Sequence, residues 1–220
     1  MRFRYRWGLF SGGIWGHFIL EVTQNIMLKK AVMLYGRFPE KFDDVPIIDI
    51  PSCNPNNEIN WMGWTKKELE KQGWRVVCPI IPEVWKAPYS AWKKALDEAG
   101  VDENTTLVGL SQGAGAIVKY IIQNNRKIRK LILVAPARTH TPEFAEFYDF
   151  EINDGVKKLI EKGTTIFVSN DDWPGILEGA KSYANDLDAK VVRFNDRGHF
   201  SFLIPTFPEL LDEMTENHDE

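Results

Sequence analysis

The chain of 220 residues has few cysteines, few histidines and no uninterrupted hydrophobic run long enough to span a bilayer. Its two cysteines, Cys53 and Cys78, cannot build a disulfide scaffold or a four-cysteine zinc site, and they form no C-x-x-C pair. We therefore expect a reducing, cytoplasmic location. The formal net charge is only −4, from 27 basic and 31 acidic residues, so the overall charge predicts no nucleic-acid partner.

Residues 1–26 differ in composition from the rest of the chain. Basic and aromatic residues alternate from Arg2 to Trp7, and an apolar, glycine-rich stretch follows from Gly8 to Leu20. This stretch is too short to cross a membrane, and no small-x-small cleavage site follows it. Three interpretations stay open: a loosely held extension, a true translation start at Met27, or an anchor at a membrane surface. We expect residues 27–220 to form one domain with an acidic tail.

Apolar runs typical of β-strands alternate with helical patterns through the middle of the chain. The predicted strands are residues 31–35, 74–79, 105–110, 130–134, 165–168 and 190–194. The predicted helices lie near residues 59–72, 89–99, 112–124, 155–162, 175–186 and 208–216. Apolar strands separated by amphipathic helices indicate a parallel sheet that is covered on both faces. The sequence therefore predicts an α/β fold, a three-layer α/β/α sandwich with a mostly parallel sheet of about six strands.

The pentapeptide Gly109-Leu110-Ser111-Gln112-Gly113 joins a predicted strand to a predicted helix. In that context the G-x-S-x-G pattern forms a sharp turn that lifts the serine hydroxyl out of the sheet. The turn also aims the backbone N–H of Gln112 and the helix N-terminus at the place where negative charge develops during acyl transfer. Ser111 is thus the candidate nucleophile. The alternative is a tight strand-to-helix turn around a buried serine.

A serine nucleophile needs a base, and the base needs a carboxylate that orients it. His199 follows the last predicted strand and has carboxylates before it, whereas the interval between Ser111 and His140 contains no acid. The carboxylate is expected at the end of the preceding strand, where Asp171 and Asp172 are adjacent. We prefer Asp172 as the partner of His199 and expect the other carboxylate to cap the following helix.

The loop after the first predicted strand is expected to supply a second donor to the developing oxyanion. Gly36 would permit a close approach of the backbone, and the N–H of Arg37 would donate beside that of Gln112. The Arg37 side chain is a candidate partner for an anionic substrate group. The alternative is an ordinary turn without a role in chemistry.

The motifs of this chain, taken in order, resemble those of the small serine hydrolases typified by retinoblastoma-binding protein nine and the bacterial YdeN-like proteins. The resemblance runs from about residue 29 to residue 214 and rests on Trp64-Thr65-Lys66-Lys67-Glu68-Leu69-Glu70, Trp92, Gly109-Leu110-Ser111-Gln112-Gly113-Ala114, Ser169-Asn170-Asp171-Asp172 and Gly198-His199-Phe200. It implies a minimal α/β-hydrolase fold without a large cap domain and a triad of Ser111, His199 and Asp172. It also implies hydrolysis of small esters and, for some members, peptidase action.

The chain departs from the pattern of that family at three places. Many relatives carry His at the position of Leu110 and Gly-Asn at the position of Gly36-Arg37. Both changes lie next to the expected site, so substrate specificity does not carry over. The partner-binding L-x-C-x-E signature is absent, because residues 99–103 read Ala-Gly-Val-Asp-Glu. Binding to the retinoblastoma protein is therefore not implied.

These residues together predict acyl transfer through Ser111, with no metal and no organic cofactor. The expected partner is a small-molecule ester or amide substrate, with a carboxylic ester that carries a small apolar acyl group placed first. An aminopeptidase or amidase with the same residues is one alternative, and a non-catalytic interaction module on a hydrolase scaffold is another. The aromatic residues between Phe144 and Phe150 either line the acyl pocket or, as we favour, form the buried face of a short helix.

Overall fold

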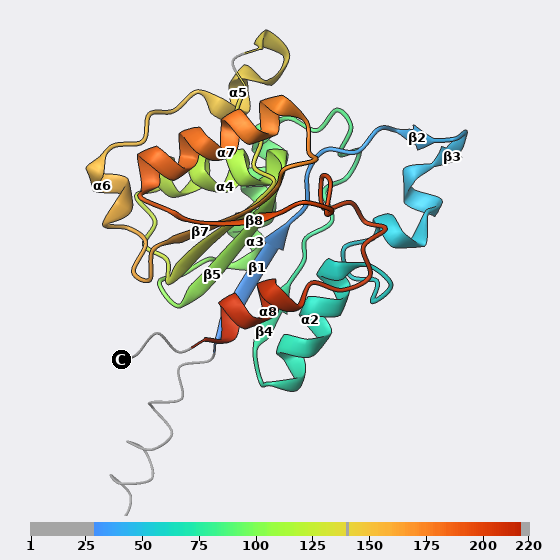
Figure 1. The fold of residues 1–220 in the computed structure, drawn as a ribbon, viewed down its shortest axis with the longest axis horizontal. Helices are drawn as coiled ribbons and strands as arrows, with labels where there is room; N and C mark the ends of the chain where they lie inside the picture. The colour runs from blue at the N-terminus through green and yellow to red at the C-terminus, as the bar shows by residue number, and fades with distance from the viewer. Residues whose placement is uncertain (1–28, 140, 217–220) are drawn as a thin grey trace, which may run out of the picture.

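A six-stranded parallel sheet forms the centre of the chain, for which a computed structural model describes residues 29–139 and 141–216 (Figure 1). The strand order is β4-β1-β5-β6-β7-β8. The strands are β1 (Lys30–Leu34), β4 (Arg75–Val77), β5 (Thr105–Leu110), β6 (Lys130–Val134), β7 (Thr164–Ser169) and β8 (Lys190–Phe194). The extension expected over residues 1–26, like His140, lies outside the described residues.

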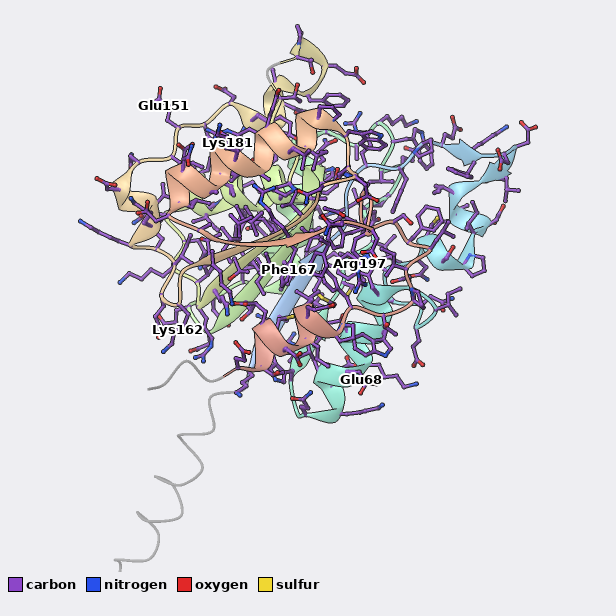
Figure 2. The ribbon with its side chains drawn as sticks, viewed as in Figure 1. Glu68, Glu151, Lys162, Phe167, Lys181 and Arg197 are labelled. Carbon is purple, nitrogen blue, oxygen red and sulfur yellow. The ribbon has the colours of Figure 1, made fainter. Side chains whose placement is uncertain are left out.

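The centre of the sheet is buried, and its inner strands are mostly apolar beyond their first one or two residues. Every residue of the four inner strands β1, β5, β6 and β7 is buried, whereas the edge strand β8 is only half-buried. Side chains follow the same division in Figure 2, where Phe167 lies inside the fold and Glu151 and Lys181 point to the outside. Parallel strands that are covered on both faces show this continuous burial rather than an alternating pattern.

Helices cover both faces of the sheet and complete the predicted three layers (Figure 1). On one face α2 (Trp61–Lys71) packs against α8 (Pro208–Thr215). On the other face lie α4 (Gln112–Gln123) and α7 (Pro174–Leu187), and α3 (Tyr89–Ala99) packs against α4. Within the described ranges, no helix is both long and apolar enough to cross a membrane.

Two short helical segments bear on the sequence predictions: one is shorter than predicted, and the other decides between the two interpretations of the aromatic segment. The helix predicted near residues 155–162 is the single turn α6 (Asp154–Lys157), because Ile160 instead forms a parallel bridge with Ile128. The aromatic segment forms a 3-10 turn, η3 (Pro142–Phe144), followed by α5 (Ala145–Tyr148). The last two residues of α5 are buried in the core, in agreement with the interpretation that we favoured for this segment.

An excursion of irregular structure between β1 and α2 has no counterpart in the sequence prediction. It contains a small hairpin, β2 (Lys41–Phe42) and β3 (Val45–Pro46), and two 3-10 turns, η1 (Ile47–Asp49) and η2 (Pro51–Cys53). The two turn residues of the hairpin, Asp43 and Asp44, have φ angles of 47° and 64°, the left-handed geometry that two-residue hairpin loops require. The hairpin projects away from the sandwich (Figure 1).

A buried ionic cluster ties α8 to the amino ends of three strands. The Glu213 carboxylate receives Lys130 Nζ at 2.5 Å, Lys190 Nζ at 2.8 Å and the hydroxyl of Thr165 at 2.8 Å. Lys130 and Glu213 expose only 7% and 5% of their side chains. Burial by itself would raise the pKa of Glu213, but the hydrogen bonds from both lysines and from Thr165 outweigh it and lower this pKa from 4.5.

We expect Glu213→Ala to lower the free energy of unfolding by about 3–5 kcal/mol, because the variant leaves the buried Lys130 without its counter-charge. A carboxylate whose pKa is lowered in the folded state stabilises that state above its ordinary pKa. That contribution is lost as the pH falls through the lowered value. Urea unfolding should therefore show a difference between wild type and variant that is full at neutral pH and shrinks below about pH 4.5.

The matched control is Asp212→Ala, on the same helix but exposed. It should change the unfolding free energy by less than about 0.5 kcal/mol. Equal losses in the two variants would show that the helix, and not the ionic cluster, is responsible.

Candidate active site

The three residues predicted to act together follow three strands of the same parallel sheet. Ser111 comes directly after β5, Asp172 follows β7 and His199 follows β8. Because these strands are parallel, their carboxyl ends meet at one edge of the sheet. In open α/β sheets ligands bind at that edge.

Ser111 occupies the strained turn that the pentapeptide predicts. Its φ and ψ angles are 54° and −120°, and α4 begins at the next residue. A non-glycine residue held in such a conformation costs about 1–3 kcal/mol. Part of what holds the turn is the hydrogen bond from the Ser111 N–H to the carbonyl of Val134 on the neighbouring strand, at 2.9 Å.

Two glycines allow other backbone segments to approach this turn. A Cβ atom at Gly113 would lie 2.5 Å from the carbonyl oxygen of Tyr35. A Cβ atom at Gly36 would lie 2.7 Å from Cβ of Ser111 and 3.2 Å from its hydroxyl oxygen. Real side chains essentially never come so close, so both positions require glycine. The backbone at Gly36 therefore lies directly beside the Ser111 hydroxyl.

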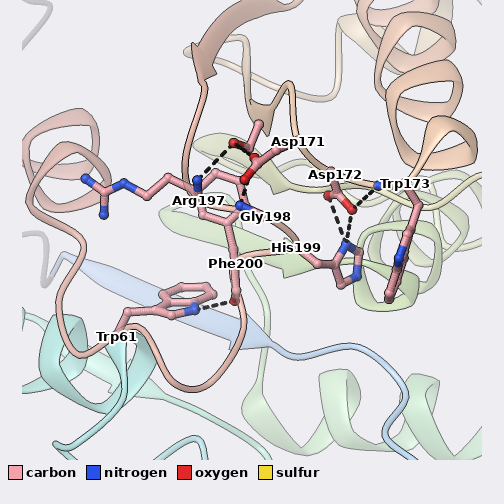
Figure 3. A network of polar contacts seen from close by, with 9 residues as sticks. Trp61, Asp171, Asp172, Trp173, Arg197, Gly198, His199 and Phe200 are labelled. Carbon is pink, nitrogen blue, oxygen red and sulfur yellow. Dashed lines mark hydrogen bonds and ion pairs between the residues drawn. The ribbon is translucent and has the colours of Figure 1, made fainter.

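Asp172 and His199 form a direct pair, although 27 residues separate them (Figure 3). The Nδ1 atom of His199 lies 3.0 Å and 2.9 Å from the two carboxylate oxygens of Asp172. The Asp172 side chain is 1% exposed, and one of its oxygens also accepts the N–H of Trp173 at 2.7 Å. A carboxylate against Nδ1 favours the tautomer with its proton there, which leaves Nε2 as an acceptor.

Among the described residues no hydrogen bond joins Ser111 to this pair, yet the segments that flank them meet. Leu110, which precedes Ser111, lines a narrow cavity together with Phe202, three residues after His199. Contacts between nucleophile and base are often long in an unliganded site and shorten when substrate binds.

The two predicted oxyanion donors have backbone N–H groups without an acceptor within the described part of the chain. Gln112 is the first residue of α4, where an N–H has no partner inside the helix. Arg37 follows Gly36, whose backbone lies against Ser111. The positive end of the helix macrodipole lies at the same turn, and it favours negative charge there.

The sequence analysis named the Arg37 side chain as a candidate partner for an anionic substrate group. In the structure this side chain instead binds backbone carbonyls. Its guanidinium donates to the carbonyls of Trp85 at 3.0 Å and Ala87 at 3.4 Å. It also lies over the ring of Phe144, 5.0 Å from the centroid. Arg37 thus ties the loop after β1 to the segment before α3.

Asp171 holds the loop that carries His199, a role that the sequence analysis missed (Figure 3). Its carboxylate accepts hydrogen bonds from the Ser169 hydroxyl at 2.5 Å and from the Gly198 N–H at 3.0 Å. The Ser169 oxygen in turn accepts the Arg197 N–H at 3.0 Å. These hydrogen bonds, that from Ser169 above all, lower the pKa of Asp171.

The prediction that the second carboxylate caps the following helix is therefore wrong. The side chain of Asp171 is engaged by Gly198, and α7 begins without a side-chain cap. A Ser-x-Asp pair just before the predicted acid is the one sequence signal that pointed to this arrangement.

Trp173 covers one side of the His199 ring. The two ring centroids are 4.6 Å apart with an interplanar angle of 34°, and Trp173 remains 65% exposed. The indole thus shields part of the imidazole while most of its own surface stays in solvent. Its position directly after Asp172 gave no separate signal in the sequence.

The two cysteines do not suit a role as nucleophile. Both are free and buried. Burial raises the pKa of Cys53 to about 11 and that of Cys78 to about 12. Because only the thiolate is reactive, both thiols are inert near neutral pH. Among the described residues, no three His, Cys, Asp or Glu side chains are grouped as metal ligands.

We expect both thiols to resist iodoacetamide in the native protein at neutral pH and to react fully after denaturation. Intact-mass spectrometry before and after unfolding measures this directly. Native labelling of Cys53 or Cys78 at the rate of free cysteine would contradict the assigned burial.

We expect Asp171→Ala to accelerate hydrogen exchange at the Gly198 and Arg197 amides, because it removes the acceptor that fixes this loop. The exposed neighbour Asp196 makes a matched control, and Asp196→Ala should leave both exchange rates unchanged. Unchanged protection in Asp171→Ala would mean that other contacts hold the loop.

Comparison with known proteins places this geometry in a family. The family model described as Serine hydrolase matches residues 48–203. Serine hydrolase RBBP9 from Rattus norvegicus is 29% identical over 151 residues, which cover 64% of this chain and 77% of that protein.

Solved structures show the same fold at lower identity. The ydeN gene product from B. subtilis is 21% identical with a TM-score of 0.64, and the match covers 85% of this chain and 97% of that one. A putative yden-like hydrolase from Pectobacterium atrosepticum is 20% identical with a TM-score of 0.59, and the match covers 90% and 95% of the two chains. The family-model match spans well over half of the chain, which therefore belongs to the serine hydrolase family.

Proposed function

We propose that this protein hydrolyses small carboxylic esters through an acyl-enzyme intermediate, with Ser111 as nucleophile, His199 as general base and Asp172 as the group that orients the imidazole. The observation that carries the proposal is the contact between the buried Asp172 carboxylate and His199, at the sheet edge where Ser111 occupies its strained turn. A Ser-His-Asp arrangement performs acyl transfer on several unrelated folds.

In the first half of the reaction the Ser111 oxygen attacks the ester carbonyl carbon while His199 Nε2 takes the hydroxyl proton. The oxyanion that forms accepts hydrogen bonds from the N–H groups of Gln112 and Arg37. The tetrahedral intermediate then breaks its bond to the alcohol oxygen, and the alcohol leaves with the proton that His199 carried. The acyl group stays on Ser111.

In the second half water attacks the acyl carbon as His199 removes one of its protons. The tetrahedral intermediate breaks the bond to the Ser111 oxygen, which regains a proton from His199, and the carboxylic acid is released. Asp172 remains ionised throughout and stabilises the imidazolium that forms in each half. Every proton and electron pair is supplied by these residues, the ester and water, so this chemistry needs no metal or organic cofactor.

An aminopeptidase or amidase would use the same residues on a different leaving group.

The two free, buried cysteines suit a reducing compartment, and we infer a cytoplasmic location for this reaction.

We expect a fluorophosphonate probe to label the wild-type protein at Ser111 and to leave Ser111→Ala unlabelled. Turnover of p-nitrophenyl acetate should fall by at least about a thousandfold in the same variant, because removing one triad member leaves only the oxyanion donors and binding. Ser90→Ala, an exposed serine on α3, is the control and should retain both signals.

Folded wild-type protein that takes no probe would instead favour a non-catalytic interaction module. If the probe does react, matched aminoacyl esters and aminoacyl amides separate the two enzymatic possibilities. Faster turnover of the amides would replace the esterase proposal with the aminopeptidase.

A further inference from the structure

An apolar groove of about 320 Å³ lies between the excursion after β1 and the segment after β4. Its walls include Tyr35, Phe38, Ile48, Ile80, Val84 and Trp85. Among the described residues that line the groove, Glu83 is the one with a charged side chain. Its carboxylate is paired with Lys86 Nζ at 2.6 Å. The groove therefore favours an uncharged, apolar ligand.

This groove adjoins the turn whose backbone lies beside Ser111. Tyr35 and Phe38 flank Gly36 and Arg37, and their rings stack with centroids 5.4 Å apart at 18°. The same two rings line the narrow cavity that Leu110 and Phe202 share. A ligand group in the groove would therefore lie next to the Gly36–Arg37 turn, whose backbone at Gly36 approaches the Ser111 hydroxyl.

The groove is preformed on one side and apolar at its mouth. The Tyr35 hydroxyl accepts the N–H of Ile81 at 2.8 Å, which holds the ring against the segment after β4. Ile48 and Ile80 at the mouth are 78% and 52% exposed. Large apolar side chains gathered in solvent around a concave surface are typical of a ligand-binding site.

We propose that this groove binds an uncharged alkyl chain of the ester that Ser111 attacks. The inference rests on the proposed function and extends it from small esters to esters with a chain of about four to eight carbons, since the groove volume is near the lower limit of the roughly 300–1,000 Å³ that small-molecule sites occupy. Whether the chain belongs to the acid or to the alcohol is decided by the first experiment.

The first experiment measures kcat/KM for p-nitrophenyl esters from acetate to octanoate and for acetate esters of alcohols from ethanol to octanol. In one of the two series kcat/KM should rise by roughly two- to fourfold for each added methylene, the gain expected for partial to full burial of that group. A flat or falling dependence in both series overturns the proposal.

The second experiment uses variants that place a charge at the mouth without touching the candidate catalytic residues. In the series that shows the chain-length dependence, Ile48→Asp and Ile80→Asp should each lower the ratio of kcat/KM for the eight-carbon ester to that for the shortest ester by at least about tenfold. Ile59→Asp is the matched control, because Ile59 is also apolar and 54% exposed but does not line the groove. Its ratio should equal that of wild type.

A binding measurement separates failure of the groove from failure of the esterase. Calorimetric titration of Ser111→Ala with 1-octanol and with ethanol reports on the groove without any chemistry. Binding of 1-octanol that is tighter than binding of ethanol, and that is lost when Ile48→Asp is added to Ser111→Ala, supports the proposal even if no ester is turned over. Equal weak binding of both alcohols overturns it, even if Ser111 is labelled by a fluorophosphonate.

Discussion

The close approach of three backbone segments at one turn is the constraint on which the candidate site depends. The end of β1, the start of α4 and the turn at Ser111 pack so tightly that side chains at Gly36 and Gly113 would collide with backbone or with Ser111 itself. This packing holds the serine at a φ of 54°, where an isolated chain would not leave it. The same contact brings the backbone at Gly36 beside the Ser111 hydroxyl.

The strained backbone lies at the carboxyl edge of the sheet, and a stabilising ionic cluster lies at its amino edge. Among the described residues, the carboxyl edge carries a strained serine, two backbone N–H groups without an acceptor and a partly exposed histidine. At the amino edge Glu213 joins two lysines and Thr165 in a buried cluster that secures α8. A parallel sheet with every inner strand buried connects the two, so stabilisation far from the site helps to maintain a local geometry that is unfavourable by itself.

The parts of the structure that depend on local pattern were predictable from the sequence. Apolar runs and helical periodicity predicted all six strands of the main sheet and its order of layers, and the elbow around Ser111 followed from two glycines and their context. The hairpin after β1 was missed because its strands are two residues long and exposed. The role of Asp171 was missed because its partner, the Gly198 backbone, follows the neighbouring strand β8 and lies 27 positions later in the chain, and sequence separation hides such contacts.

Trp61 anchors the loop that carries His199 from α2, a helix that holds none of the candidate catalytic residues. Its indole Nε1 donates to the carbonyl of Phe200 at 2.9 Å (Figure 3). Its backbone N–H donates to the carbonyl of Ile204, also at 2.9 Å. The first turn of α2 and the chain around His199 are thereby joined across 139 positions of sequence. A substitution in α2 that rotates or shifts this turn would therefore move the chain around His199, although α2 holds none of the candidate catalytic residues.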